Sequence, residues 1–171
     1  MPDNNNDNHE LPLIQQYQRF MHQAFKLAED AYEEKEVPVG AVIVKDNRII
    51  GRGYNQVERL KDPTAHAEIL AISAACSTID NKLLEDCTIY VTLEPCPMCA
   101  GALVWSRISR IVFGASDAKA GACGSLFNLA SNNKLNHRIE VVQGVMEQDC
   151  EWILKQFFRE QRPGSNGQSD R

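Results

Sequence analysis

The 171 residues of this chain, 43% of them hydrophobic, are enough for one domain with a core of its own. The apolar runs fall short of the roughly 18 residues of a membrane span, and the polar, acidic N-terminus is unlike a signal peptide, so we expect a cytoplasmic protein with no membrane partner. The formal net charge of −5 argues against a broadly basic nucleic-acid-binding domain. Residues 1–36, with eight acids and three bases, account for all of that excess, so a local RNA-binding patch stays compatible with the composition.

Residues 1–10 are polar and rich in asparagine and aspartate, and we predict that they form a disordered leader. Residues 11–162 are predicted to fold as a single domain, and residues 163–171 to form a flexible tail. From Leu11 onward, apolar residues recur at steps of three and four, which predicts an amphipathic helix that ends near Glu36.

The rest of the chain alternates strands and helices. Two apolar runs flank Asp46-Asn47-Arg48, a sequence typical of a tight turn, and predict an antiparallel hairpin. The expected strands span residues 39–45, 49–54, 87–93, 108–114 and 138–144, and the expected helices span residues 63–76, 98–105, 126–130 and 147–162. A hairpin followed by alternating helices and strands predicts an α/β fold, with one mixed sheet and helices on both of its faces.

Two short motifs bring metal-ligand chemistry into this framework. His66 and Glu68 lie near the start of the predicted helix 63–76, and Cys96 and Cys99 follow the carboxyl end of a strand. Catalytic zinc sites use three protein ligands and keep a fourth position for water, whereas structural sites close with four. One imidazole and two thiols match the three ligands of a catalytic zinc site, and one carboxylate remains that need not bind the metal. We therefore expect Zn²⁺ at His66, Cys96 and Cys99, with Glu68 moving the proton.

The spacing within each motif supports this division of roles. Side chains two residues apart on a helix point about 200° from one another, so His66 and Glu68 are not expected to bind one ion together. With His66 at the helix start and Glu68 in the first turn, the carboxylate can lie beside the metal without binding it. Pro97 is well placed as a first helical residue, which puts both cysteines near a helix amino terminus that favours thiolates.

Other interpretations of these motifs are weaker. A lone C-x-x-C also occurs in structural zinc sites and in redox pairs. The sequence has no second such pair to complete a closed zinc site, and a redox pair needs no histidine and glutamate upstream. Glu94 is a second candidate acid, but it lies on the strand side of the cysteines, so we assign proton transfer to Glu68.

His-x-Glu followed by Pro-Cys-x-x-Cys is the known signature of zinc nucleobase deaminases. Together with the runs 37–41, 62–68, 117–121 and 157–159, it resembles the bacterial tRNA-specific adenosine deaminases over about residues 12–162. This resemblance implies the three-layer α/β/α fold of the cytidine deaminase superfamily, with a mixed five-stranded sheet that begins with an antiparallel hairpin. It also implies that the domain forms a homodimer.

The resemblance assigns further residues to the substrate. Asn55 matches a position that contacts the target base, and Val37 matches an apolar position of the base pocket. Asp117, Lys119 and Phe158 match positions that line the channel for the nucleotide loop. From the residues alone, an asparagine at a strand end more often forms a turn, although its amide can both donate to and accept from a purine edge.

The segment between residues 45 and 61 is locally basic. Its five basic residues face two acids, an excess of three, and are Lys45, Arg48, Arg52, Arg59 and Lys61. A basic patch beside Asn55 is typical of a surface that contacts RNA phosphates, although a solvated surface explains any single one of these residues equally well.

The leading hypothesis is hydrolytic deamination of adenosine to inosine at the wobble position of a tRNA anticodon stem-loop, with Zn²⁺ and no organic cofactor. Two alternatives stay open. The same two motifs occur in deaminases of free cytidine, deoxycytidylate or guanine, from which Asn55 and the runs 117–121 and 157–159 distinguish the chain. The other alternative is a catalytically idle, zinc-stabilised RNA-binding module. Glu68 argues against that module, because a purely structural site has no use for it.

Overall fold

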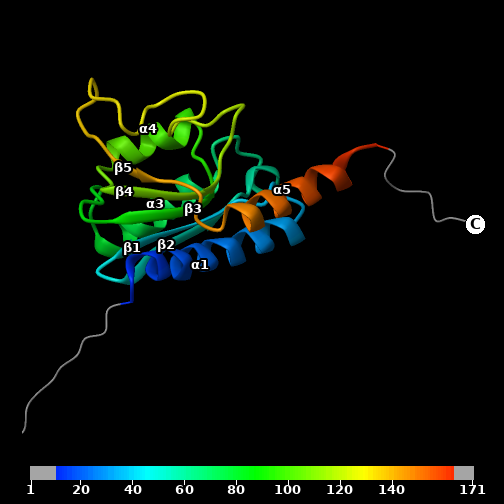
Figure 1. Cartoon of the computed structure of the whole chain (residues 1–171), viewed down its shortest axis with the longest axis horizontal. Helices are drawn as coiled ribbons and strands as arrows, with labels where there is room; N and C mark the ends of the chain where they lie inside the picture. Colours follow the sequence, from blue (N-terminus) through cyan, green and yellow to red (C-terminus); the bar gives the residue numbers. More distant parts are fainter. Residues whose placement is uncertain (1–10, 164–171) are drawn as a thin grey trace, which may run out of the picture.

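One mixed five-stranded sheet lies between two layers of helices (Figure 1). The computed structural model describes residues 11–163; the predicted leader, and the predicted tail from residue 164 onward, lie outside this range. The strands are β1 (Gly40–Lys45), β2 (Arg48–Tyr54), β3 (Thr88–Leu93), β4 (Arg110–Ala115) and β5 (Glu140–Val142). The helices are α1 (Leu13–Glu33), α2 (Val57–Leu60), α3 (Ala67–Ile79), α4 (Pro97–Trp105) and α5 (Glu147–Gln161).

The strands follow the order β2-β1-β3-β4-β5 across the sheet. β1 is antiparallel to both of its neighbours, β2 and β3, whereas β3, β4 and β5 are parallel to one another. The predicted hairpin and the mixed five-stranded sheet are therefore confirmed. Because β3 and β4 are parallel, their carboxyl ends meet at one edge of the sheet, where α/β folds collect their ligands.

Each face of the sheet is covered by an apolar cluster of its own. On one face, α1 and α5 pack through buried residues such as Phe20 and Cys150 against Val112 of β4. Figure 1 shows these two helices side by side on that face. On the other face, α3 and α4 bury Ala71 and Leu103 against the same central strands. Burial on both faces explains why β3 and β4 read as continuous apolar runs.

The start of α3 lies very close to β2. A Cβ atom added at Gly53 would stand 2.3 Å from the carbonyl oxygen of Ala67, and one added at Gly51 would stand 2.5 Å from that of Ala71. Only glycine leaves room for another backbone this near. These small residues therefore set the amino terminus of α3 directly against the sheet, and they position the His-x-Glu motif with it.

Helix α3 begins at Ala67 and not at residue 63 as predicted, because the residues before it form a turn. The Asp62 carboxylate accepts hydrogen bonds from the N–H group of Thr64 at 2.8 Å and from its hydroxyl at 2.7 Å. Local side-chain bonds of this kind compete with helix formation. The predicted loop 55–62 in turn contains the short helix α2, which the sequence pattern did not indicate.

The predicted helix at 126–130 is wrong. An isolated antiparallel bridge joins Cys123 to Asn128, and Gly124 adopts a φ of 136° that ends any regular element. The Asn128 side chain also accepts the N–H group of Ser131 at 3.1 Å, which gives the backbone an alternative to helical bonding. The last strand, β5, is correctly placed but shorter than predicted.

Candidate active site

His66, Cys96 and Cys99 converge just beyond the carboxyl end of β3. The Nδ1 atom of His66 lies 3.6 Å from the Cys96 sulfur and 3.5 Å from the Cys99 sulfur. The three possible ligand atoms all lie within 4.8 Å of one another. His66 and the two cysteines, which follow it by 30 and 33 positions in the chain, thus form one group that could hold a metal ion.

Helix amino termini position these side chains. His66 is the N-cap residue of α3 and Cys96 is the N-cap residue of α4, both with extended backbone angles. Pro97 is the first residue of α4, a position that suits its ring. Glu68 lies in the first turn of α3. The two motifs therefore meet where two helix amino termini favour negative charge.

The group has the dimensions of a tetrahedral zinc site. Zinc binds thiolates at about 2.3 Å and imidazole nitrogens at about 2.0–2.1 Å, so tetrahedral angles place a nitrogen and a sulfur about 3.5 Å apart. The nitrogen–sulfur distances of 3.6 and 3.5 Å agree with that value. Three donors leave a fourth coordination position open. The residues therefore fit a metal ion with the size and ligand preference of zinc, in a site of the catalytic type.

The two thiols of the group differ in acidity. A hydrogen bond from the Cys99 thiol, assisted by a bond to His66, lowers the pKa of Cys96 to about 4. The bond to Cys96 and burial raise the pKa of Cys99 above its ordinary value. The bond to Cys96 likewise raises the pKa of His66. A bound metal ion deprotonates a coordinating thiol outright, so both cysteines would then serve as thiolates.

Glu68 is an acid that interacts with all three residues of this group. The residue is 4% exposed, and burial raises the pKa of its carboxyl. Its carboxyl also lies near enough to the Cys99 thiol for each group to shift the pKa of the other. Glu68 is not one of the three residues whose ligand atoms cluster. A carboxyl with a raised pKa beside an open metal position is placed to take up and release a proton.

A pocket of about 570 Å³ opens onto the group, a volume within the usual range of small-molecule sites. Seven of the nine residues assigned to the site from the sequence line it, namely Val37, Asn55, His66, Glu68, Cys96, Asp117 and Phe158. The other two lie outside the lining: Cys99 is buried behind it, and the side chain of Lys119 is exposed. The structure thus brings together segments from six separate parts of the chain at one cavity.

Known proteins resemble this chain over nearly its whole described length. The family model for MafB19-like deaminases matches residues 15–162. A Bacillus subtilis (strain 168) protein named tRNA-specific adenosine deaminase is 50% identical over 143 residues, which cover 84% of this chain and 89% of that protein. The chain belongs to the MafB19-like deaminase family.

Solved deaminase structures agree with that assignment. A structure from studies of A-to-I editing by tRNA:A34 deaminases at the wobble position of transfer RNA matches with a TM-score of 0.77 and 43% identity, over 80% of this chain and 99% of that one. This match confirms the cytidine-deaminase-like fold. A guanine deaminase from Bacillus subtilis matches less well, with a TM-score of 0.57 and 41% identity over 63% of this chain and 69% of that one.

Asn55 is anchored inside the pocket of the deaminase. The residue is 7% exposed, its Nδ2 atom donates to the Val37 carbonyl at 3.3 Å, and its Oδ1 atom accepts the N–H group of Val57 at 3.3 Å. The side chain therefore does form a turn, as the residue type alone indicates. An amide has two donor hydrogens and two acceptor lone pairs, so one of each remains for a ligand.

Glu94, the second candidate acid, is already hydrogen-bonded within the protein. It is 2% exposed, and its carboxylate accepts the N–H groups of Asp117 at 3.3 Å and of Cys123 at 3.2 Å. It also accepts the N–H group of Ser125 at 3.2 Å and the Ser125 hydroxyl. Glu94 therefore braces the loop after β4 against the metal-binding segment. This structural role favours Glu68 as the acid of the deaminase.

The predicted channel residues surround the pocket in different ways. Asp117 uses its carboxylate to close its own turn, accepting the N–H groups of Lys119 at 3.0 Å and Ala120 at 3.2 Å. Phe158 is 50% exposed and lies edge-on to Phe157, with ring centroids 5.4 Å apart. An exposed aromatic ring at the edge of a pocket is available to stack on a base.

The predicted basic patch is smaller than the residue count suggests. Arg59 and Lys61 form ion pairs with neighbouring acids, at 3.3 and 3.7 Å. Within residues 11–163, no such pair involves Lys45, Arg48 or Arg52. Only Arg52 of these three lies near Asn55, three residues before it, whereas Lys45 and Arg48 pair with each other at the hairpin turn, at the opposite end of both strands from Asn55.

Proposed function

We propose that this deaminase hydrolyses adenosine to inosine at the wobble position of a tRNA anticodon loop. The observation that carries the proposal is the buried Glu68 carboxyl beside the ligand atoms of His66, Cys96 and Cys99 at a pocket of about 570 Å³. The Bacillus subtilis relative, which is 50% identical and is named for adenosine deamination in tRNA, supports this substrate. The structure from wobble-position editing studies supports it independently.

His66, Cys96 and Cys99 would hold the zinc ion, which when bound would lower the pKa of a water molecule to roughly 7. Water adds to C6 of the adenine, and the Glu68 carboxylate takes up the proton that is lost as the C–O bond forms. Glu68 then donates a proton to the exocyclic nitrogen, which leaves as ammonia. One buried residue thus serves both proton transfers, and its raised pKa suits the uptake as well as the release.

Asn55 is proposed to bind the base, with the donor and the acceptor that its local bonds leave free. Val37 lines the pocket beside it and gives the base an apolar contact. Phe158 and Asp117 line the same pocket, and we assign them, with the exposed Lys119, to the flanking nucleotides. Of the hairpin cations, we assign Arg52, three residues before Asn55, to the phosphate backbone that single-stranded loops present together with their base edges.

Asn55→Ala is expected to lower kcat/KM about tenfold to hundredfold, because a well-placed amide on a purine edge is worth about 1–3 kcal/mol. The measurement is steady-state deamination of an anticodon stem-loop, with thermal melting in parallel. Asn55→Asp is the informative companion, because it keeps the acceptor for the Val57 N–H group and removes the amide donor. Full activity in Asn55→Asp would contradict a donor bond from Asn55 to the base.

Deamination of free guanine is the second candidate, favoured by the 41% identity to the guanine deaminase. Mass-spectrometric inosine analysis of total tRNA incubated with the protein separates the two. We expect inosine to appear at the wobble position of a tRNA that carries adenosine there. Unchanged tRNA, together with conversion of guanine to xanthine, would establish the second candidate in its place.

We further propose that the protein works as a cytoplasmic homodimer. Five large apolar side chains on α4 and in the 121–139 region are at least partly exposed, namely Met98, Trp105, Leu126, Phe127 and Leu135. Exposed apolar patches mark interfaces in soluble proteins. Between residues 11 and 163, no helix is long and apolar enough to cross a membrane. Light scattering should give twice the chain mass, and Trp105→Glu should return it to the mass of one chain.

A further inference from the structure

Helix α2 is part of the pocket wall, although none of its residues is buried. Val57 and Glu58 of this helix line the pocket, two and three residues after Asn55. Four residues are too few for a helix that is stable by itself, because helices shorter than about 12 residues are marginal in water. Polar contacts from elsewhere in the chain must therefore hold α2 in position.

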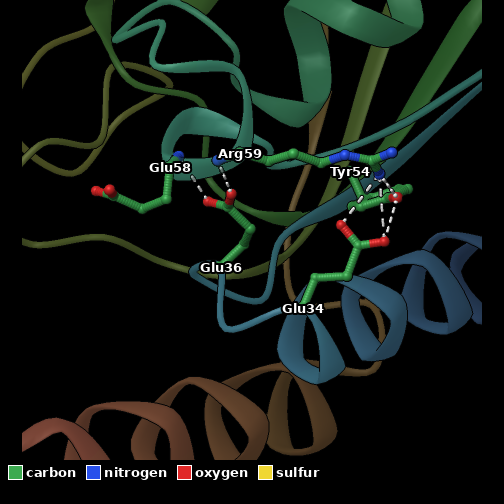
Figure 2. Close-up of polar contacts among 5 residues, drawn as sticks. All are labelled: Glu34, Glu36, Tyr54, Glu58 and Arg59. Carbon is green, nitrogen blue, oxygen red and sulfur yellow. Dashed lines mark hydrogen bonds and ion pairs between the residues drawn. The ribbon is translucent and has the colours of Figure 1, made fainter.

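Those contacts come from the carboxylate of Glu36. A helix start leaves its first four N–H groups without partners inside the helix. Glu36 accepts two of them, from Glu58 at 3.1 Å and from Arg59 at 2.6 Å, one on each carboxylate oxygen (Figure 2). The other two, those of Gln56 and Val57, bond the Ala65 carbonyl at 3.0 Å and the Asn55 side chain at 3.3 Å. Bonds to a carboxylate are about twice as strong as bonds between neutral groups, so Glu36 supplies the strongest link to α2.

The end of α1 delivers this carboxylate. Lys35 adopts a left-handed φ of 63°, and its N–H group bonds the Tyr32 carbonyl at 3.0 Å. The N–H group of Glu36 bonds the Ala31 carbonyl at 2.9 Å, which completes a Schellman motif. The backbone then turns inward, and Glu36 is 1% exposed. Glu36 thus joins the end of α1 to a helix 22 residues further along the chain.

Glu34, at the same corner, makes a different kind of contact. Its carboxylate bonds the guanidinium of Arg59 at 3.3 Å and accepts the Tyr54 hydroxyl at 2.8 Å (Figure 2). Its side chain is 38% exposed. Glu34 therefore holds the Arg59 side chain, whereas Glu36 holds the backbone of α2. The same substitution, glutamate to glutamine, therefore affects the bonds to the α2 backbone at Glu36 but not at Glu34.

We propose that Glu36 is a positioning residue for substrate binding in this deaminase: its buried carboxylate holds α2 so that Asn55, Val57 and Glu58 form a preorganised wall for the flipped nucleotide. The inference rests on the proposed function for its kinetic consequence. Because the Glu36 carboxylate bonds α2 and not the His66 group, its loss raises KM and leaves the chemical step intact. Zinc content likewise stays unchanged.

The test compares Glu36→Gln with Glu34→Gln in the full chain. A glutamine keeps the shape of the side chain but turns an N–H₂ group toward one of the two backbone donors, which leaves that donor unpaired. We expect Glu36→Gln to raise KM for an anticodon stem-loop about tenfold, with kcat within about twofold. Hydrogen exchange at the amides of Glu58 and Arg59 should accelerate by a similar factor. Glu34→Gln should change neither quantity.

Each other outcome has a definite meaning. Faster exchange with an unchanged KM would overturn the proposal, as would a lower kcat with an unchanged KM, because Glu36 would then act in the chemistry. If Glu36→Gln does not fold, Glu36→Asp replaces it: the shorter carboxylate keeps the charge but reaches one donor at most, and the same KM increase is required. If the unmodified protein does not deaminate the stem-loop, the proposed function fails, and the exchange rates alone decide whether Glu36 holds α2.

Discussion

Glu68→Ala is expected to lower single-turnover deamination by at least about 10²- to 10⁴-fold, the usual worth of general acid–base help, because one residue serves both proton transfers here. The variant should nevertheless keep about one zinc per chain, since three other residues provide the ligands. It should also still bind RNA. The measurements are metal analysis and deamination of a stem-loop under single-turnover conditions.

The split between activity and metal content decides the role of Glu68. A variant that lost its zinc would make Glu68 a fourth ligand, and the site would be structural. A variant that kept full activity would move the proton transfer to another group. Glu94 is the next acid at the pocket, but its carboxylate is taken up by hydrogen bonds to the loop after β4.

Cys96→Ala should affect metal and fold together. Removing one of three ligands should empty the site, and a ligand present at a thousand times its Kd contributes about 4 kcal/mol to the free energy of unfolding. We therefore expect loss of zinc, a clear drop in Tm and no detectable deamination. Metal analysis and thermal melting with and without a chelator check this. The unmodified protein treated with the chelator should melt at nearly the same temperature as the variant.

Cys76→Ala is the matched control for this prediction. Cys76 is a free, half-buried cysteine of α3 outside the ligand group. Its substitution should leave zinc content and activity unchanged. If Cys96→Ala retained a full complement of zinc, the assignment of Cys96 as a ligand would be wrong, whatever its effect on activity.

The sequence predicted the parts of this protein that depend on local chemistry. Strands and long helices followed from apolar periodicity, and the ligand group followed from two motifs whose spacing suits helix amino termini. His66 and Cys96 both occupy N-cap positions, as that spacing requires. Asn55, Val37 and Phe158 entered through resemblance to known deaminases, and the structure places them at one pocket.

The sequence did not predict features that depend on contacts between distant segments. Helix α2 has no apolar periodicity that would predict it, and a carboxylate 22 residues away, that of Glu36, stabilises it. The loop after β4 is not helical, because Glu94 and Asn128 bind its backbone N–H groups. Neither glutamate has a local signal, since Glu36 is only the end of the predicted first helix and Glu94 only precedes Pro95. Glu36 is 1% exposed and Glu94 is 2% exposed, and only the three-dimensional structure shows that these carboxylates are buried.

Comparison of one RNA with free bases and nucleosides tests the central claim most directly. An anticodon stem-loop with adenosine at the wobble position, free adenosine, free cytidine and free guanine are each incubated at equal concentration with the zinc-loaded protein. Single-stranded loops expose base edges and phosphates together, so we expect rapid inosine formation in the stem-loop, slowed by added salt, and little turnover of the free compounds. Equal or faster turnover of any free compound would contradict the assignment of this deaminase to tRNA.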